Sequence, residues 1–248
     1  AASAAPTEPS APSPSAAANA KPTFSAYAPG LFKADFGHAT GDPSLYAPTI
    51  RFPIKDATTT LNSQLQNPGG MYGGGGSECS AQNYNEVWWD TFCEKRDASR
   101  ASLNCSSRKI HQGVDIRAGS AEICKRMKSG ERKLVPVVAV ADGVIDHVGS
   151  YSVSLKTAIG TFKYLHLDMA SLAFGGPPHR VKSGDLIGYL WNDFGGSATT
   201  FHLHFEHWMS VAGKGFVPVP VYCDLVRAYE RDRGKAYVLA GGAKHCAA

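Results

Sequence analysis

Two distant segments of the chain carry histidines at spacings that suit one shared site. His202 and His204 are separated by one residue, and a β-strand directs such residues to the same face. Upstream, His111 and Asp115 would lie roughly 13 Å apart in a fully extended chain, too far for both to reach one ion. The chain must therefore turn between them, most easily at Gly113. We expect a fold that brings both segments together around one centre.

The donor atoms of these residues predict a metal site. Neutral imidazole is a common zinc ligand, and a carboxylate can complete a three-ligand site that leaves one position open. The expected ligands are His111, Asp115 and one histidine of the pair. Each histidine taken alone has a plainer interpretation, as a half-buried or exposed side chain, and only the combined pattern favours zinc.

Composition divides the chain into an N-terminal part and a foldable remainder. Residues 1–20 are almost all Ala, Pro and Ser, too poor in apolar surface to offset the entropy of ordering, so we expect a disordered linker there. Residues 21–55 keep many prolines but gain aromatic residues, which predicts an extended segment that could pack on the domain. Residues 56–248 are long enough for one compact domain with a substantial core.

Several features favour a location outside the cytoplasm. The chain opens at Ala1 rather than Met, and an Ala/Pro/Ser tract is typical of a segment behind a cleaved signal peptide or an anchor. Six scattered cysteines without a Cys-x-x-Cys pair favour disulfides over a zinc ribbon, with buried free thiols as the alternative. We prefer a Cys223–Cys246 pair and expect the other four cysteines to pair among themselves. No run of about eighteen apolar residues occurs, so no transmembrane segment is expected. We predict a periplasmic or secreted protein.

Short strand patterns joined by turns dominate the second half of the chain. Residues 135–141 and 144–148 predict a hairpin around Asp142-Gly143, and further strands are expected at 152–156, 161–167, within 181–189 and at 201–208. Helices are expected near residues 121–129 and 223–231. Because no amphipathic helices separate the strands, the pattern predicts a mainly β fold built on an antiparallel sheet.

The charge of the chain is mildly basic and selects no partner. The formal net charge is +4 and the pI is about 8.7, with no dense run of lysine and arginine. Nucleic-acid binding would require a clustered basic stripe or a recognised motif, so no nucleic-acid partner is expected. A modest positive charge suits a polyanionic cell surface equally well.

Five motifs occur in one order along the chain. They are His111-x-x-x-Asp115, residues 138–145, Tyr164-Leu165-His166-Leu167, residues 181–188 and His202-Leu203-His204-Phe205-Glu206. This succession resembles the lysostaphin-type (LytM-domain) zinc metallopeptidases, which cut peptide bonds in bacterial peptidoglycan. The resemblance covers a family core of about residues 107–208. It implies an antiparallel β-sheet with a groove, of the duplicated-hybrid-motif type, with long loops and one or two short helices.

The resemblance also implies a role for each histidine and aspartate of these motifs. His111, Asp115 and His204 match the ligands of one Zn²⁺ ion, and His166 and His202 match the two catalytic histidines that are not ligands. A zinc-bound water would be the nucleophile. One catalytic histidine would accept its proton, and the other would hydrogen-bond the water or the oxyanion. The sequence does not assign these two roles between His166 and His202.

Other residues near the motifs carry weaker expectations. Glu206 lies on the ligand-facing side of its strand and could support a ligand. Arg117 shares the ligand side of Asp115, where a structural ion pair is a better expectation than contact with a substrate carboxylate. His207 should face away from His204, because an odd number of residues separates them. The remaining histidines fit no motif: His38, His147, His179 and His245.

The metal-ligand pattern and the resemblance together imply a zinc-dependent endopeptidase that acts on peptidoglycan cross-links or stem peptides. Long insertions at about residues 68–108 and 118–134 flank the first motif, so the sequence does not determine which peptide bond is cut. A D-Ala–diaminopimelate cross-link is slightly favoured over a glycine bridge, because no wall-targeting domain is recognisable. The alternatives are a non-catalytic LytM-type regulator that binds a cell-wall amidase and a secreted general protease of the same fold.

Overall fold

The computed structural model describes residues 21–32, 36–37, 41–99, 103, 105 and 107–248. Residues 1–20, where a linker is expected, and His38, which fits no motif, lie outside these ranges. Among the described residues, no helix is both long enough and apolar enough to cross a bilayer.

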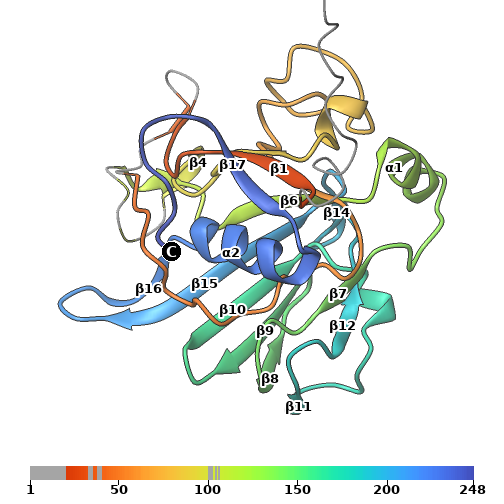
Figure 1. Cartoon of the computed structure of the whole chain (residues 1–248). Coiled ribbons are helices and arrows are strands. Elements are labelled where there is room, and N and C mark those ends of the chain that lie inside the picture. Colours follow the sequence, from red (N-terminus) through yellow and green to blue (C-terminus); the bar gives the residue numbers. More distant parts are fainter. Residues whose placement is uncertain (1–20, 33–35, 38–40, 100–102, 104, 106) are drawn as a thin grey trace, which may run out of the picture.

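One large antiparallel sheet forms the body of the molecule (Figure 1). Its strand order is β11-β8-β9-β10-β15-β6-β2, and β16 pairs with the outer part of β15. The strands are β2 (Thr59–Leu61), β6 (Val114–Ala118), β8 (Gly143–Val148), β9 (Ser152–Thr157), β10 (Gly160–Leu165), β11 (His179–Val181), β15 (Leu203–Val211) and β16 (Gly215–Val219). The prediction of a mainly β fold with an antiparallel sheet is confirmed.

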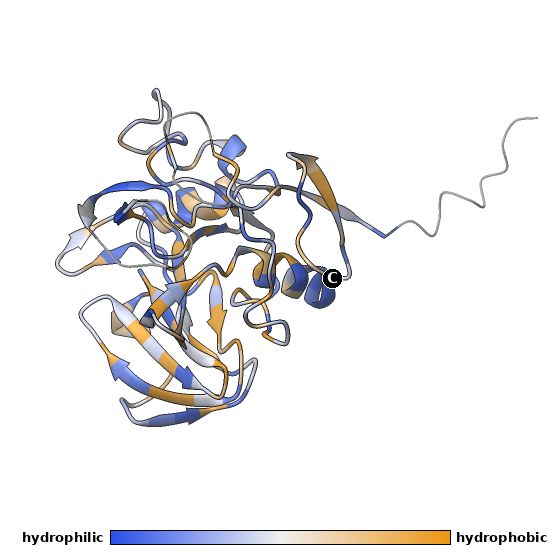
Figure 2. Cartoon of the chain, turned by 90° about the vertical axis from the view of Figure 1, so that its left-hand side faces the viewer, coloured by the Kyte–Doolittle hydropathy of each residue, from blue (hydrophilic) through white to orange (hydrophobic). Residues whose placement is uncertain are grey.

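Alternation along the central strands separates a packed face from a polar face. Phe162 of β10 stacks on Phe205 of β15 with ring centroids 5.7 Å apart, and Tyr164 meets Phe205 at 5.1 Å. His204 and Glu206 alternate with Phe205 along β15 and therefore point to the opposite face. Hydrophobic and hydrophilic residues follow one another along the strands of the sheet in Figure 2.

A second, parallel sheet covers one end of the molecule. It consists of β1 (Thr23–Tyr27) between β17 (Ala236–Gly241) and β3 (Val87–Trp88). Phe24 of β1 packs against Trp88 at 4.8 Å and against Tyr229 of the neighbouring helix at 5.0 Å between ring centroids. Segments from both ends of the described chain thus share one aromatic cluster.

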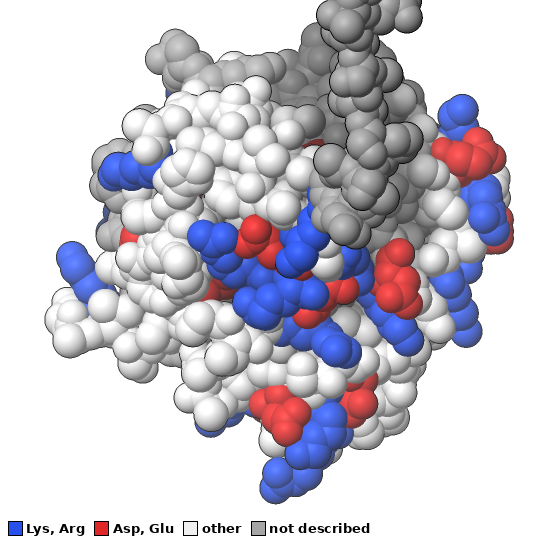
Figure 3. Space-filling model, viewed as in Figure 1, with Lys and Arg blue, Asp and Glu red and all other residues white. Residues whose placement is uncertain are grey.

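The two α-helices lie where the sequence predicts them. Helix α1 spans Ala121–Lys128, and the Ser120 side chain caps it by accepting a hydrogen bond from the Ile123 amide. Helix α2 spans Tyr222–Arg233 and is followed by Gly234, whose left-handed φ of 61° is favoured by glycine. The face that carries α2 mixes basic and acidic side chains (Figure 3), including the ion pair between Arg227 and Glu230 at 2.6 Å.

The remaining elements are short. They are β4 (Lys95–Ser99) paired with β5 (Lys109–Ile110), β7 (Pro136–Val138) paired with β12 (Leu186–Tyr189), β13 (Asp193–Phe194) paired with β14 (Ser197–Ala198), and the 3₁₀ turns Ala81–Asn83 and Met169–Ser171.

The predicted hairpin between residues 135–141 and 144–148 is wrong. β7 pairs with β12, whereas β8 pairs with β9 and β11. The other edge of β7 is occupied by residues 51–55: the Val138 amide donates to the Pro53 carbonyl at 2.9 Å, and the Lys55 amide donates to the Pro136 carbonyl at 3.0 Å. The strand propensity and the turn signal were both correct. The neighbour of β7, however, comes from a segment about eighty residues upstream, and local sequence patterns do not specify such long-range pairing.

Three disulfides cross-link the described chain: one joins the two insertions to each other, one lies within the first insertion, and one joins α2 to the C-terminal end. They join Cys79 to Cys124, Cys93 to Cys105, and Cys223 to Cys246. The preferred Cys223–Cys246 pair and the pairing of the other four among themselves are confirmed. Disulfides are typical of oxidising compartments.

Candidate metal centre

The pairing of two sheet strands brings the expected ligands together. His204 of β15 lies directly opposite Asp115 of β6 in the antiparallel register, and His111 follows β5 immediately before the chain bends into β6. The bend expected at Gly113 is present. A Cβ at this position would lie 2.3 Å from the Phe205 carbonyl oxygen. Glycine therefore lets the first motif approach β15 closely, which is a requirement for space and not for a left-handed backbone.

The three ligand atoms form a compact triangle. His111 Nε2 lies 2.7 Å from His204 Nδ1, and Asp115 Oδ1 lies 3.1 Å from the first nitrogen and 3.2 Å from the second. All three side chains are buried. This is the one cluster of histidine, cysteine and acidic residues in the described part of the chain that could hold a metal ion.

Neighbouring acceptors decide which ring nitrogens carry hydrogen. His111 Nδ1 lies 2.8 Å from the Thr91 carbonyl oxygen, which can only accept, so Nδ1 donates and Nε2 keeps its lone pair. His204 Nε2 likewise donates to Glu206 Oε1 at 2.8 Å, which leaves a lone pair on Nδ1 of the neutral ring. With the Asp115 oxygen, three electron-pair donors converge. Zinc ligands at bond lengths of about 2 Å are about 3.3 Å apart in a tetrahedral site, so the cluster fits zinc.

Ionisation of the cluster also suits a cation. Burial lowers the pKa of His204, but hydrogen bonds to Asp115 and Glu206 outweigh it and raise the pKa to about 9. Burial raises the pKa of Asp115, yet electrostatic attraction to the His111 and His202 imidazoles and hydrogen bonds with His111 and His204 hold it well below its usual range. Burial lowers the pKa of His111 to about 4, so this ring is neutral at pH 7. A proton therefore rests on His204 where a metal ion could displace it.

The two expected catalytic histidines lie beside this cluster. The rings of His166 and His202 are 4.7 Å apart, and that of His166 is 6.2 Å from His204. His166 directly follows β10 with a φ of 65°, a left-handed conformation uncommon for a residue other than glycine and often found at functional sites. His202 Nε2 lies 3.5 Å from Asp115 Oδ1.

Backbone carbonyls orient both rings toward the groove. His166 Nδ1 donates to the Asp193 carbonyl oxygen at 2.7 Å, and His202 Nδ1 donates to that of Thr200 at 2.8 Å. Each neutral ring therefore carries its lone pair on Nε2. Burial lowers the pKa of His166 to about 4 and that of His202 well below its usual value, so both rings are neutral at pH 7.

A groove of about 480 Å³ opens over these five residues. Tyr151 forms part of its wall, stacked on His166 with an interplanar angle of 6° and ring centroids 5.9 Å apart. Phe194 packs on Tyr151 at 5.1 Å and is 48% exposed at the rim. The other walls include Gln64, Leu65, Arg96 and Lys163. Sequence reasoning missed these wall residues, because none belongs to a recognisable spacing.

The expectation for Arg117 needs correction. Its side chain is fully buried and donates to Asn62 Oδ1 at 3.1 Å and to the Glu78 carbonyl oxygen at 3.0 Å. It is therefore held by hydrogen bonds to neutral groups rather than by the expected ion pair, and it does not reach the groove. Its strand pairs with β2, and the side chain is held by the segment that follows β2, at Asn62, and by the insertion, at Glu78.

The residues beside His204 on β15 follow the parity argument. Glu206 contacts His204 as described, and Trp208 Nε1 donates to its other oxygen at 2.5 Å. His207 lies on the opposite face, stacked on Phe162 at 4.4 Å, with Nε2 donating to the Ile159 carbonyl oxygen at 2.9 Å. The prediction that His207 faces away is confirmed.

No family model matches the chain, and no curated protein matches its sequence. Among solved structures, a protein from Ruminococcus gnavus described as a glycyl-glycine endopeptidase lytM is 25% identical over 52% of this chain and 50% of that one, with a TM-score of 0.37. The antimicrobial peptidase lysostaphin from Staphylococcus simulans is 22% identical over 60% of this chain and 53% of that one, with a TM-score of 0.37. A zinc containing peptidase from Vibrio cholerae is 21% identical over 46% and 32%, with a TM-score of 0.30.

The chain spans about half the length of the first two of these proteins. Because these TM-scores are low, the chemistry of the site is argued from the residues of this chain alone. The structural neighbours of the protein are lysostaphin- and LytM-type peptidases, at low sequence identity.

Proposed function

We propose that this protein is a zinc-dependent endopeptidase that hydrolyses peptide bonds in bacterial peptidoglycan, within cross-links or stem peptides. The observation that carries the proposal is the convergence of three metal-ligating atoms, from His111, Asp115 and His204, in an open groove. The assignment of peptidoglycan as the substrate is supported by the succession of five motifs that resembles the lysostaphin type.

His111, Asp115 and His204 would hold the zinc ion through Nε2, Oδ1 and Nδ1. A bound zinc ion supplies Lewis acidity, which lowers the pKa of water and polarises a carbonyl group. Glu206 fixes the His204 ring by accepting its Nε2 hydrogen, and the Thr91 carbonyl does the same for His111. Both ligand rings are thus oriented before any ion arrives.

His166 and His202 would move the protons. Each is neutral at pH 7 and presents Nε2 to the groove, so each can accept a proton from water and return it to a leaving amine. A protonated imidazole can also donate a hydrogen bond to the oxyanion of a tetrahedral intermediate. Because the rings lie 4.7 Å apart, the two roles fall within reach of one scissile bond.

We place the metallopeptidase domain at residues 56–248, with its family core at about 107–208 and the segment 21–55 packed on it. Pairing of β1 with β17 and β3 supports that packing. We further propose that the protein works outside the cytoplasm, in the periplasm or after secretion, which the three disulfides support.

Product analysis on defined substrates tests the proposal. Purified protein is incubated with muropeptides, a pentaglycine peptide and casein, and the products are identified by mass spectrometry, with His204→Ala as the control. Zinc content of both proteins is measured in parallel by elemental analysis. Zinc-dependent cleavage of muropeptides by the wild type alone supports the proposal. Cleavage of casein alone would indicate a general protease, and a zinc-free, inactive protein would favour the regulator that binds an amidase.

A further inference from the structure

Arg96 joins the metal cluster from an insertion that the motifs do not include. It lies on β4, whose Lys95 pairs with Ile110 immediately before His111. Its guanidinium faces two carboxylates: Nη1 donates to Glu94 Oε2 at 2.5 Å, and Nη2 lies 3.4 Å from Asp115 Oδ2. The side chain is 15% exposed, and those of Glu94 and Asp115 are 3% and 2% exposed. Arg96 therefore links two buried acids at the edge of the groove.

The two oxygens of Asp115 have different neighbours. Oδ1 faces the imidazoles of His111 and His204, whereas Oδ2 faces Arg96. A carboxylate without such a contact can rotate, or can offer both oxygens to one ion. We infer that Arg96, held by Glu94, is a positioning residue that fixes Asp115 so that only Oδ1 serves as a metal ligand. This inference rests on the proposed function of the cluster as a zinc site.

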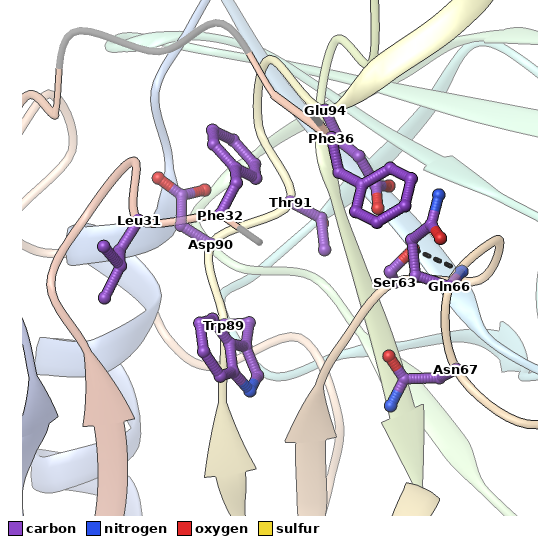
Figure 4. A pocket seen from close by; sticks show the side chains of 10 residues that line it. All are labelled: Leu31, Phe32, Phe36, Ser63, Gln66, Asn67, Trp89, Asp90, Thr91 and Glu94. Atoms are coloured by element: carbon purple, nitrogen blue, oxygen red, sulfur yellow. Dashed lines mark hydrogen bonds between the residues drawn. The ribbon is translucent and has the colours of Figure 1, made fainter. Parts of the chain in front are cut away.

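Glu94 is built to hold Arg96 in one place. Its own backbone carbonyl accepts the His111 amide hydrogen at 2.8 Å, and the Cys93 amide donates to the His111 carbonyl at 2.9 Å. The buried Glu94 side chain lines a cavity of about 140 Å³ together with Ser63 and Phe36 (Figure 4). The acid that anchors Arg96 is thus fixed to the backbone of a ligand residue, so Arg96 is placed relative to the site itself.

The preceding residues of this loop support the same ligands. The Thr91 carbonyl accepts the His111 Nδ1 hydrogen at 2.8 Å, and Thr91 Oγ1 accepts the Asp115 amide hydrogen at 3.0 Å. Residues 91–96 therefore contact His111 through its ring and backbone and Asp115 through its backbone and side chain. A charge-assisted contact from Arg96 completes this arrangement at Oδ2, the Asp115 oxygen that faces away from the cluster.

Metal binding by three variants tests the inference. Zn²⁺ affinity is measured by chelator competition on the full chain for Arg96→Gln, Arg96→Lys and Glu94→Gln. Arg126→Gln is the matched control, because Arg126 also pairs with a glutamate, Glu131, but is 44% exposed and lies on α1. We expect affinity about 10- to 100-fold below wild type for Arg96→Gln and Glu94→Gln, and no change for the control. Arg96→Lys keeps the positive charge but cannot span both carboxylates, so we expect an intermediate loss.

A second measurement separates positioning from general destabilisation. With Co²⁺ in place of zinc, the visible absorption bands report the number and arrangement of ligands. We expect these bands to shift in Arg96→Lys. The near-ultraviolet circular dichroism of this variant should match that of wild type, which would show that its fold is intact. Zinc affinity within twofold of wild type in all three variants would overturn the inference. If affinity is unchanged and only the KM for a peptide rises, Arg96 would instead be assigned to substrate binding. Failure of wild type itself to bind zinc would instead overturn the proposed function.

Discussion

His204 Nδ1 lies 3.2 Å from Asp115 Oδ1, and the two residues are direct partners in the antiparallel register of β15 and β6. The site is therefore part of the sheet, because a backbone ladder sets the separation of two of its ligands. His111 joins them from the bend before β6, at 2.7 Å from His204. Such a centre should respond sharply to changes in ligand chemistry and in strand spacing.

Replacing the ligand carboxylate should abolish tight zinc binding. Asp115→Asn keeps the size of the side chain but removes the charge that the two imidazoles face. Loss of a ligand should exceed the weakening of about 10- to 100-fold typical of outer contacts. Isothermal titration with Zn²⁺ measures the change, with the exposed Asp146→Asn as the control. Zinc affinity equal to wild type in Asp115→Asn would remove this residue from the ligand set.

His166→Ala and His202→Ala should lose activity while keeping the metal. Neither ring belongs to the triangle of ligand atoms, and each presents Nε2 to the groove. We expect zinc at the wild-type ratio and kcat on muropeptides lower by about 100-fold or more. Elemental analysis and product release are measured on the same preparations. Loss of zinc from either variant would contradict the assignment as non-ligands.

Gly113→Ala should destabilise the fold at the site. The added methyl group would lie 2.3 Å from the Phe205 carbonyl oxygen, and a strand backbone cannot move aside as a flexible side chain can. We expect a loss of about 1–3 kcal/mol in the free energy of unfolding, measured by denaturant titration. Gly175→Ala is the control, because a Cβ there meets nothing within 4 Å. Equal stability of the two variants would show that β6 and β15 can separate without cost.

Asp90 should make the protein less stable as the pH rises. Its oxygens accept backbone hydrogens from Gly30 and Phe92, each at 2.9 Å, but burial raises its pKa to about 7. Between about pH 4, where the unfolded chain releases this proton, and pH 7, the folded state binds more protons than the unfolded state. Stability contributed by protonated Asp90 is therefore present below about pH 4 and is lost as the pH approaches 7, by at most about 4 kcal/mol.

The measurement compares wild type with Asp90→Asn by denaturant unfolding at several pH values from 4 to 8. Other groups titrate in both proteins, so the difference between the two curves isolates Asp90. We expect wild type to lose stability relative to the variant as the pH rises through this range. Parallel curves would mean that Asp90 has the same pKa in the folded and unfolded states.

Local patterns predicted the parts of the molecule that local chemistry determines. Alternation on a strand correctly oriented His204 and His207 to opposite faces, and the helices expected near residues 121–129 and 223–231 are α1 and α2. The pairing of β1 with β17 was not predictable, since the two strands lie about two hundred residues apart and carry no shared signal. Arg96 escaped notice for a related reason: its role depends on the register of β4 with β5, which no motif records.

The alternation on β15 has a further consequence for how the site tolerates mutation. A slip of one residue in the pairing of β15 with β10 would exchange Phe205 and His204 between interior and cleft. The stacking of Phe205 on Phe162 opposes such a slip. Aromatic packing on the opposite face of the sheet thus holds the strand register that positions the metal ligands. A core mutation far from zinc could therefore still misplace those ligands.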